Sequence, residues 1–170
     1  MGTDKAMLGW DGGTLLEHMV RTLETVAGTV RVLGPLDLAD RNPDRGPVEG
    51  IATALGATTT SDNLIVAVDL PYIDTRFLEY FVGAMEESGT GFVTCEVNHQ
   101  TPLCLGIHRS LLIGIDAYLE SGGRSARGLF DTIGHNTITE DQLIGAGFST
   151  DLFRNLNTPE DYSETQKPSS

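Results

Sequence analysis

Positive charge is scarce in this chain. Its 170 residues include 11 Lys plus Arg against 24 Asp plus Glu, which gives a formal net charge of −13. The phosphate backbone of DNA or RNA would be repelled by such a chain, so we expect no nucleic-acid partner. An anionic small substrate stays compatible with this charge if a divalent metal and backbone N–H groups supply a local positive field.

Cysteines and long apolar runs are also few. Cys95 and Cys104 lie in apolar, strand-like surroundings without metal-site spacing, so we expect both to fill the core rather than form a disulfide. The longest purely aliphatic run, 64–68, is far shorter than the roughly 20 residues that span a bilayer, and no basic-then-apolar leader opens the sequence. We therefore expect a cytoplasmic protein with no membrane partner.

Lysine occurs only twice, at Lys5 and Lys167, while arginine supplies the other basic residues. A lysine carries a compact ammonium, which contacts phosphate as a point charge rather than as a flat fork. From composition alone, a solvated position near the start of the sequence is the simpler interpretation of Lys5.

Helical and strand patterns alternate along the chain, which predicts an α/β fold: a three-layer sandwich around a mostly parallel sheet. The length suits one domain, which we place at 1–165, followed by a disordered tail at 166–170. The predicted helices cover 14–26, 74–85, 111–119 and 124–132, with a further one beginning at Pro159, and the predicted strands cover 29–33, 63–68, 91–97, 102–107 and 137–139. Thr14 with Glu17 matches a capping box, and Asp74 matches an N-cap.

Ligands of open α/β sheets collect outside the carboxyl ends of the strands. Asp69 follows the predicted buried strand and precedes Pro71, so it is placed either to hold Mg²⁺ through a hard oxygen or to cap the next turn. Asn157 could complete the metal's coordination or contact a second substrate, or it could cap the helix predicted at Pro159. The enzymatic hypothesis requires the Asp69 side chain to face away from the hydrophobic interior and to lie at the cleft that Lys5 and Asn157 border.

Other polar residues are weaker candidates. Gly12-Gly13 precedes a predicted helix but lacks the longer loop and lysine of a phosphate-binding site, and an Asp-Gly turn explains it. Arg124 and Arg127 could meet an anionic phosphate, although a helix surface is the simpler role. The four histidines show no metal spacing and no nucleophile partner, so packing or surface roles suffice.

Four short segments resemble, in order, the sequence signature of the molybdenum cofactor guanylyltransferases. Residues 1–6 are similar to the end of the family's Leu-Ala-Gly-Gly-x-Ser-x-Arg-Met-Gly-x-Asp-Lys-Ala, 45–51 to its Gly-Pro-Leu-x-Gly-Ile, 68–72 to its Asp-x-Pro, and 155–161 to its Asn-x-Asn-Thr-Pro-Glu-Asp. Each motif alone is weak, so the resemblance rests on the four collinear matches across about residues 1–162.

The resemblance implies a Rossmann-like nucleotidyltransferase fold and transfer of GMP from Mg²⁺-GTP to molybdopterin cofactor, giving molybdopterin guanine dinucleotide and pyrophosphate. It also implies a downstream partner, the molybdoenzyme or the cofactor-insertion machinery that receives the product. By the same resemblance, Lys5 would balance charge on the triphosphate, Asp69 would hold Mg²⁺, Asp40 with Gly46 and Pro47 would hold the nucleoside, and Asn155 and Asn157 would face the second substrate, Asn157 also serving as a metal ligand. Asp37 and Asp44 are near enough to leave the choice of Asp40 open.

One part of the family signature has no counterpart here, namely the first strand and the Gly-Gly-x-Ser-x-Arg loop. We expect a domain that is incomplete at its N-terminus, in which the absent central strand leaves backbone groups of its two neighbours unpaired and activity weak. Two alternatives stay open. One is a nucleotidyltransferase for another base or acceptor, such as a cytidylyltransferase or a sugar-phosphate nucleotidyltransferase, and the other is a non-catalytic homologue.

Overall fold

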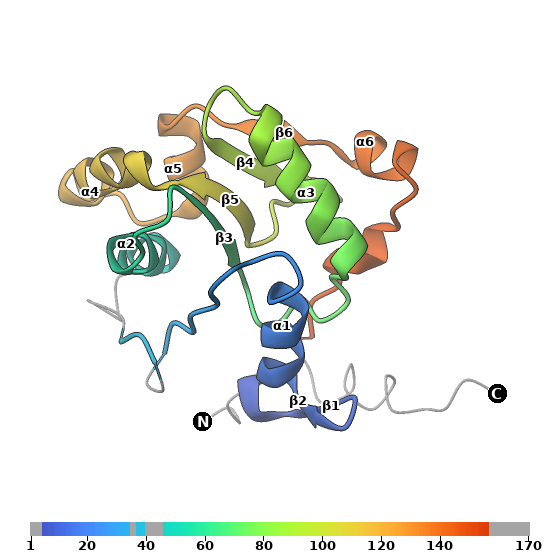
Figure 1. The fold of residues 1–170 in the computed structure, drawn as a ribbon. Helices are drawn as coiled ribbons and strands as arrows, with labels where there is room; N and C mark the ends of the chain where they lie inside the picture. The colour runs from blue at the N-terminus through green and yellow to red at the C-terminus, as the bar shows by residue number, and fades with distance from the viewer. Residues whose placement is uncertain (1–4, 35–36, 40–45, 157–170) are drawn as a thin grey trace.

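A computed structural model describes residues 5–34, 37–39 and 46–156 of the chain (Figure 1). The helices are α1 (Leu15–Leu23), α2 (Pro47–Ala57), α3 (Thr75–Glu87), α4 (Leu112–Glu120), α5 (Ala126–Thr132) and α6 (Glu140–Gly145), with 3-10 turns η1 (Lys5–Met7), η3 (Arg109–Leu111) and η4 (Thr150–Phe153). The strands are β1 (Gly9–Trp10), β2 (Gly13–Thr14), β3 (Asp62–Val66), β4 (Phe92–Cys95), β5 (Cys104–His108) and β6 (Asn136–Ile138). Within these described residues, no helix combines the length and the apolar character needed to cross a bilayer.

The main sheet has four strands in the order β3-β5-β4-β6. β4 and β6 are parallel, whereas β5 runs antiparallel to both β3 and β4. Strands β3, β4 and β6 therefore share one direction, and β5 is reversed. The predicted mostly parallel sheet is confirmed in this sense, and the reversal follows from the short hairpin that joins β4 to β5.

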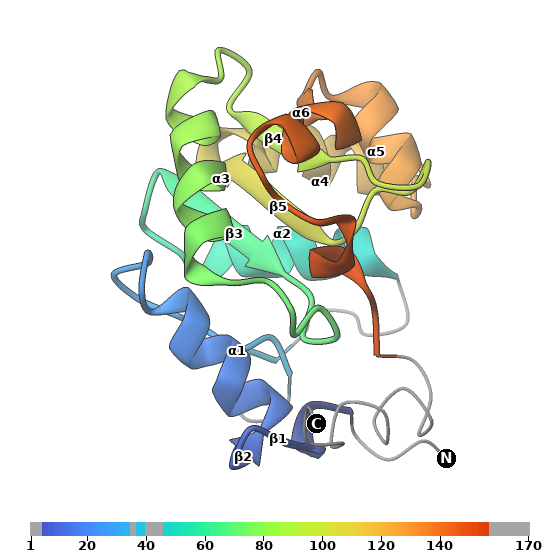
Figure 2. The same cartoon turned by 90° about the vertical axis from the view of Figure 1, so that its right-hand side faces the viewer.

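Two hydrophobic clusters cover the two faces of the sheet, which confirms the three-layer sandwich (Figures 1 and 2). Successive side chains of a strand point to opposite faces, so Val93 joins the cluster under α3 while its neighbour Phe92 joins the cluster under α2, α4 and α5. Cys95 and Cys104 are buried free thiols, as predicted. Burial raises the pKa of Cys95 to about 12 and also raises the pKa of Cys104.

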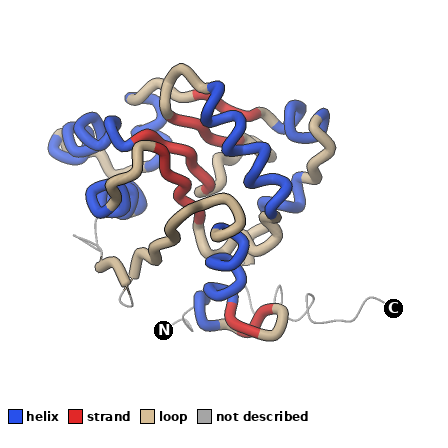
Figure 3. The backbone as a smooth tube through the Cα atoms, viewed as in Figure 1, coloured by secondary structure: helices blue, strands red, loops and turns tan. Residues whose placement is uncertain are grey.

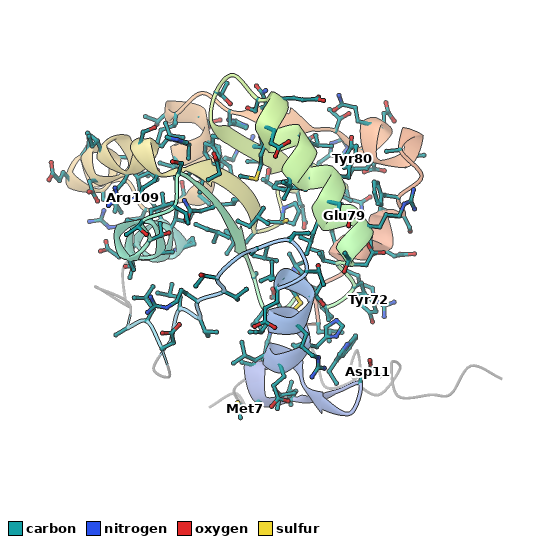
Figure 4. The ribbon with its side chains drawn as sticks, viewed as in Figure 1. Met7, Asp11, Tyr72, Glu79, Tyr80 and Arg109 are labelled. Atoms are coloured by element: carbon teal, nitrogen blue, oxygen red, sulfur yellow. The ribbon has the colours of Figure 1, made fainter. Side chains whose placement is uncertain are left out.

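Helix α1 and the β1–β2 hairpin lie together at one end of the molecule (Figures 1 and 2). The predicted capping box is present, because Thr14 Oγ1 accepts from Glu17 N at 3.2 Å and Glu17 Oε2 accepts from Thr14 N at 2.8 Å. Asp11 and Gly12 form the hairpin tip with φ of 43° and 78° (Figure 4). Gly12 therefore adopts the left-handed backbone that a tight turn needs. This agrees with the prediction that an Asp-Gly turn, and not a phosphate-binding loop, explains Gly12-Gly13.

The strand predicted at 29–33 does not form. This segment belongs to a long loop between α1 and α2 (Figure 3), and its only ladder contact among the described residues is an isolated bridge from Leu33 to Leu38. A strand needs a partner, and within the described residues β3 pairs on one side only, with β5. Leu33 packs instead against α2, where its Cδ2 would lie 3.0 Å from a Cβ added at Gly50.

Candidate active site

A pocket of about 440 Å³ lies at the carboxyl ends of β3 and β4. Its size is within the range of small-molecule sites. The walls come from the segment after β3, the β4–β5 hairpin with the start of β5, and the segment that begins at η4. The lining residues are Ala67 and Asp69, then Val97, Asn98, Gln100, Thr101, Pro102 and Leu103, and finally Thr150, Asp151, Phe153, Arg154 and Asn155.

Asp69 is half-buried in this lining and not in the core, which meets the first condition of the enzymatic hypothesis. The second condition, a position at a cleft bordered by Lys5 and Asn157, stays a prediction. Backbone hydrogen bonds fix its segment on both sides, from Ala67 N to Leu103 O at 2.8 Å and from Leu156 N to Asp69 O at 3.1 Å. The N-cap of the following helix is Asp74, whose Oδ1 accepts from Phe77 N at 2.8 Å. Asp74, not Asp69, is therefore the residue that caps α3.

The β4–β5 hairpin gives the pocket a rigid wall. Asn98 and His99 both have left-handed backbone, with φ of 51° and 59°, as the tight hairpin turn requires. Val97 and Gln100 exchange two backbone hydrogen bonds of 2.9 Å. Glu140 of α6 accepts from Asn98 N at 2.8 Å, so the turn is tied to a second element. The side chains at the rim are thus held by backbone that has little freedom.

Arg154 enters the pocket lining from the segment after η4 and contacts Tyr72. Its Nη2 donates to Tyr72 Oη at 2.6 Å, and its guanidinium carbon lies 4.8 Å from the centre of the Tyr72 ring. Tyr72 in turn packs edge-on against Trp10 at 5.5 Å, beside the N-terminal end of α3 (Figure 4). His18 contacts Trp10 at 5.8 Å and donates from Nε2 to the Pro71 carbonyl at 2.9 Å, so the hairpin and α1 support the Asp69 segment.

The structure brings together part of the predicted site. Asp69 and Asn155 line the same pocket. Gly46 and Pro47 lie at the N-terminus of α2, and this end of the helix turns toward the same edge of the sheet as η4 (Figure 2). Lys5 lies in η1, outside the pocket lining. Asp40 and Asn157 are outside the described residues.

Two further predictions concern residues near α4 and α5. Arg124 Nη1 donates to the Leu119 carbonyl at 2.8 Å, so it closes the C-terminal end of α4, which supports a structural role. Gly46 has left-handed backbone with φ of 82°, and a Cβ there would lie 3.5 Å from the Arg124 carbonyl oxygen. The glycine is therefore needed for the backbone turn into α2.

Sequence reasoning missed the polar walls of the pocket. Asn98, Gln100 and Thr101 lie between the strands predicted at 91–97 and 102–107, and the rule that ligands collect after strand ends applies to β4 as well as to β3. Arg154 carries no signal in the sequence, because its place in the pocket depends on how η4 packs against the sheet.

Comparisons with known proteins agree with the geometry. The family model described as "MobA-like NTP transferase domain" matches residues 1–137. The chain belongs to this family. It is 30% identical over 169 residues to a molybdenum cofactor guanylyltransferase of Xanthomonas euvesicatoria, an alignment that covers 96% of this chain and 86% of the relative. The resemblance on which the sequence analysis relied is thereby confirmed.

Solved structures support the same fold. Molybdopterin-guanine dinucleotide biosynthesis protein A from Archaeoglobus fulgidus superposes with a TM-score of 0.73 at 16% identity, covering 97% of this chain and 90% of that one. The 2-C-methyl-D-erythritol 4-phosphate cytidylyltransferase of Thermus thermophilus gives a TM-score of 0.69 at 15% identity, with coverage of 95% and 92%. The predicted nucleotidyltransferase fold is therefore confirmed.

Proposed function

We propose that this protein transfers GMP from Mg²⁺-GTP to the terminal phosphate of molybdopterin cofactor. Family membership and the guanylyltransferase relative support the reaction type and the acceptor. The observation that carries the proposal is the pocket at the carboxyl edge of the sheet, in which Asp69 and Asn155 from two distant motifs line one cavity. The cytoplasmic location and a downstream molybdoenzyme or insertion partner stay predictions.

The reaction needs no nucleophile from the protein. An oxygen of the acceptor phosphate attacks the α-phosphorus of GTP, a new oxygen–phosphorus bond forms, and the bond to the bridging oxygen breaks as pyrophosphate leaves with its electron pair. The chain then contributes by holding the two reactants in line and by stabilising charge. A pocket built of fixed backbone suits that role.

The residues of the pocket fit a magnesium ion. Mg²⁺ prefers oxygen ligands and commonly takes only one or two carboxylates, keeping water and substrate phosphates as its other ligands. Asp69 would hold it, with the Asn155 amide oxygen and the Asp151 carboxylate in the same lining. Among the described residues no group of three or more His, Cys, Asp or Glu gathers into a metal site. When bound, Mg²⁺ would neutralise charge on the triphosphate.

The nucleotide would lie on the side of Asp69 that faces α2. A helix that precedes a parallel strand runs opposite to it, so the N-terminus of α2 lies at the same edge as the end of β3. Gly46 and Pro47 at this helix start would hold the nucleoside with Asp40, and Lys5 would meet the triphosphate. Asn157 would assist Asn155 with the acceptor or the metal.

The substitution Asp69→Asn tests the proposal. Loss of the metal carboxylate should lower GMP transfer and pyrophosphate release by at least about a hundredfold, the scale seen when a charge-stabilising group is lost. Asp62→Asn is a matched control, because Asp62 begins the strand that Asp69 follows and lies at the opposite end. Full activity in the Asp69 variant would contradict the assignment.

Competition among nucleotides separates the alternatives. Preference for GTP over CTP and UTP, measured by Mg²⁺-dependent pyrophosphate release, is the expected result. Preference for CTP or UTP would assign the chain to another base. Absence of pyrophosphate release with every nucleotide, even after a segment of the family's Leu-Ala-Gly-Gly type is added upstream, would identify a non-catalytic homologue.

The outer edge of β3 could accept a further strand. Within the described residues the outer edge of β3 has no partner, and its apolar residues are only half-buried. An added strand of the family's Leu-Ala-Gly-Gly type would pair with this edge and place a glycine-rich loop near the triphosphate. Fusing such a segment ahead of Met1 should increase GTP binding, and unchanged binding would count against this part of the proposal.

A further inference from the structure

We propose that Arg154, held in place by Tyr72, binds the terminal phosphate of the acceptor and so selects phosphorylated acceptors. This inference rests on the proposed function, because it assumes that a phosphomonoester is the attacking group. It concerns a residue outside the four sequence motifs. Its basis is that Arg154 lines the Asp69 pocket and that its guanidinium contacts Tyr72, which lies outside that lining.

The charge of the pocket leads to this assignment. The lining includes two carboxylates, Asp69 and Asp151, and among its described residues Arg154 is the only basic one. A phosphomonoester carries close to two negative charges at neutral pH. Such a group would be repelled by the carboxylates of a chain with a net charge of −13 unless a cation is fixed beside it. Arg154 is placed to be that cation.

The geometry of a guanidinium suits the chemistry. Its planar fork of N–H donors matches two oxygens of a phosphate at once. A phosphomonoester has three terminal oxygens, so two can face Arg154 while the third attacks the α-phosphorus. Lysine would supply charge without fixing which oxygen is turned toward the nucleotide. The arginine would thus orient the nucleophile as well as attract it.

Tyr72 is a positioning residue for this arginine. An exposed arginine has many rotamers, and ordering it on binding reduces the affinity gained. The hydrogen bond of 2.6 Å to Tyr72 Oη and the stacking at 4.8 Å restrict the side chain before substrate arrives. Tyr72 is itself held by Trp10 at 5.5 Å and follows Pro71, whose carbonyl accepts from His18. The arginine is therefore supported by a packed aromatic cluster.

Trp10 provides a direct assay, because it is the only tryptophan in the chain and contacts Tyr72. The full chain is titrated with 6-hydroxymethylpterin phosphate and with 6-hydroxymethylpterin, following Trp10 fluorescence. We expect the phosphate form to bind about tenfold or more tightly, the scale of a charge-assisted hydrogen bond. Arg154→Met should remove this difference, Arg154→Lys should keep part of it, and Tyr72→Phe should reduce it. Arg21→Met, an exposed arginine on α1, should leave it unchanged.

Two results would overturn the inference: an unchanged phosphate preference in Arg154→Met, or no binding of the phosphate form to the unsubstituted chain. Thermal unfolding of each variant confirms that it is folded. Mg²⁺-GTP binding, measured by equilibrium dialysis, should be the same in Arg154→Met as in the unsubstituted chain. A phosphate preference that depends on Arg154, together with full activity in Asp69→Asn, would keep this inference and reject the metal assignment.

Discussion

Phe77 links the hydrophobic core to the pocket, which gives a prediction about both stability and binding. Its side chain is fully buried on α3 and contacts the rings of Phe81, Phe148 and Phe153 at 5.7, 5.8 and 5.1 Å. Phe153 ends η4 and lines the pocket, directly before Arg154 and Asn155. A substitution at Phe77 should therefore also affect the wall of the pocket.

These contacts set the expected loss in the free energy of unfolding for the substitution Phe77→Leu. Truncation of a buried phenylalanine to alanine removes about 3–5 kcal/mol, and leucine keeps roughly half of the packing. Each lost aromatic pair removes about 0.5–1.5 kcal/mol more. At the lower end of these contributions, we expect the free energy of unfolding to fall by at least about 3 kcal/mol, measured by urea denaturation with the slope unchanged.

Phe92→Leu is the matched control. Phe92 is also fully buried, but it belongs to the cluster on the other face of the sheet, where its aromatic contacts are Phe130 at 5.4 Å and His135 at 5.8 Å. No buried member of that cluster lines the pocket. Both variants should lose stability, whereas only Phe77→Leu should weaken binding of the pterin phosphate under conditions in which both are folded. Equal effects of the two variants on binding would refute the proposed link through Phe153.

Three smaller predictions follow from local structure. Gly91→Ala should lower the free energy of unfolding by about 1–2 kcal/mol in urea denaturation, because Gly91 has a φ of 65° and a Cβ there would lie 3.0 Å from His108 Cβ. Thr139→Ala should cost about 1 kcal/mol in the same assay, since it removes the capping box of α6. Burial raises the pKa of Cys95 to about 12, so the folded chain keeps a thiol proton that the unfolded chain releases. Stability should therefore be unaffected by this thiol below about pH 9 and fall by up to about 1.4 kcal/mol per pH unit above it, a slope that Cys95→Ala should reduce.

The features that the sequence predicted well depend on neighbouring residues. The Thr14–Glu17 capping box and the Asp74 N-cap involve side chains and backbone within one helical turn, so the local pattern is sufficient. The alternation of β4 likewise places Phe92 and Val93 on opposite faces. Asp69 was predicted as a site residue because it follows a strand, and it does line the pocket, since the place of a strand end in an α/β sheet is a property of the fold class. Its role stays a prediction.

The features that were missed depend on distant residues. The segment 29–33 has the alternation of a strand, yet a strand forms only where a partner offers its edge, and Leu33 packs against α2 instead. Arg154 belongs to the pocket only because Phe153 packs on Phe77, more than seventy positions earlier in the chain. No periodicity within either segment encodes such a contact.

The outer edge of β3, which has no partner among the described residues, connects the fold to the order of the segment that carries Asp69. In an antiparallel pair every second residue turns its N–H and C=O groups away from its partner, and for β3 those groups face an edge without a partner among the described residues. Beyond the strand, the segment that carries Asp69 is held by its hydrogen bonds to Leu103 and Leu156. Hydrogen exchange should therefore be faster in β3 than in β5, which is paired on both sides. A strand added at the outer edge should slow exchange in β3 and raise activity together, because the same hydrogen bonds would order the strand and the carboxylate that follows it.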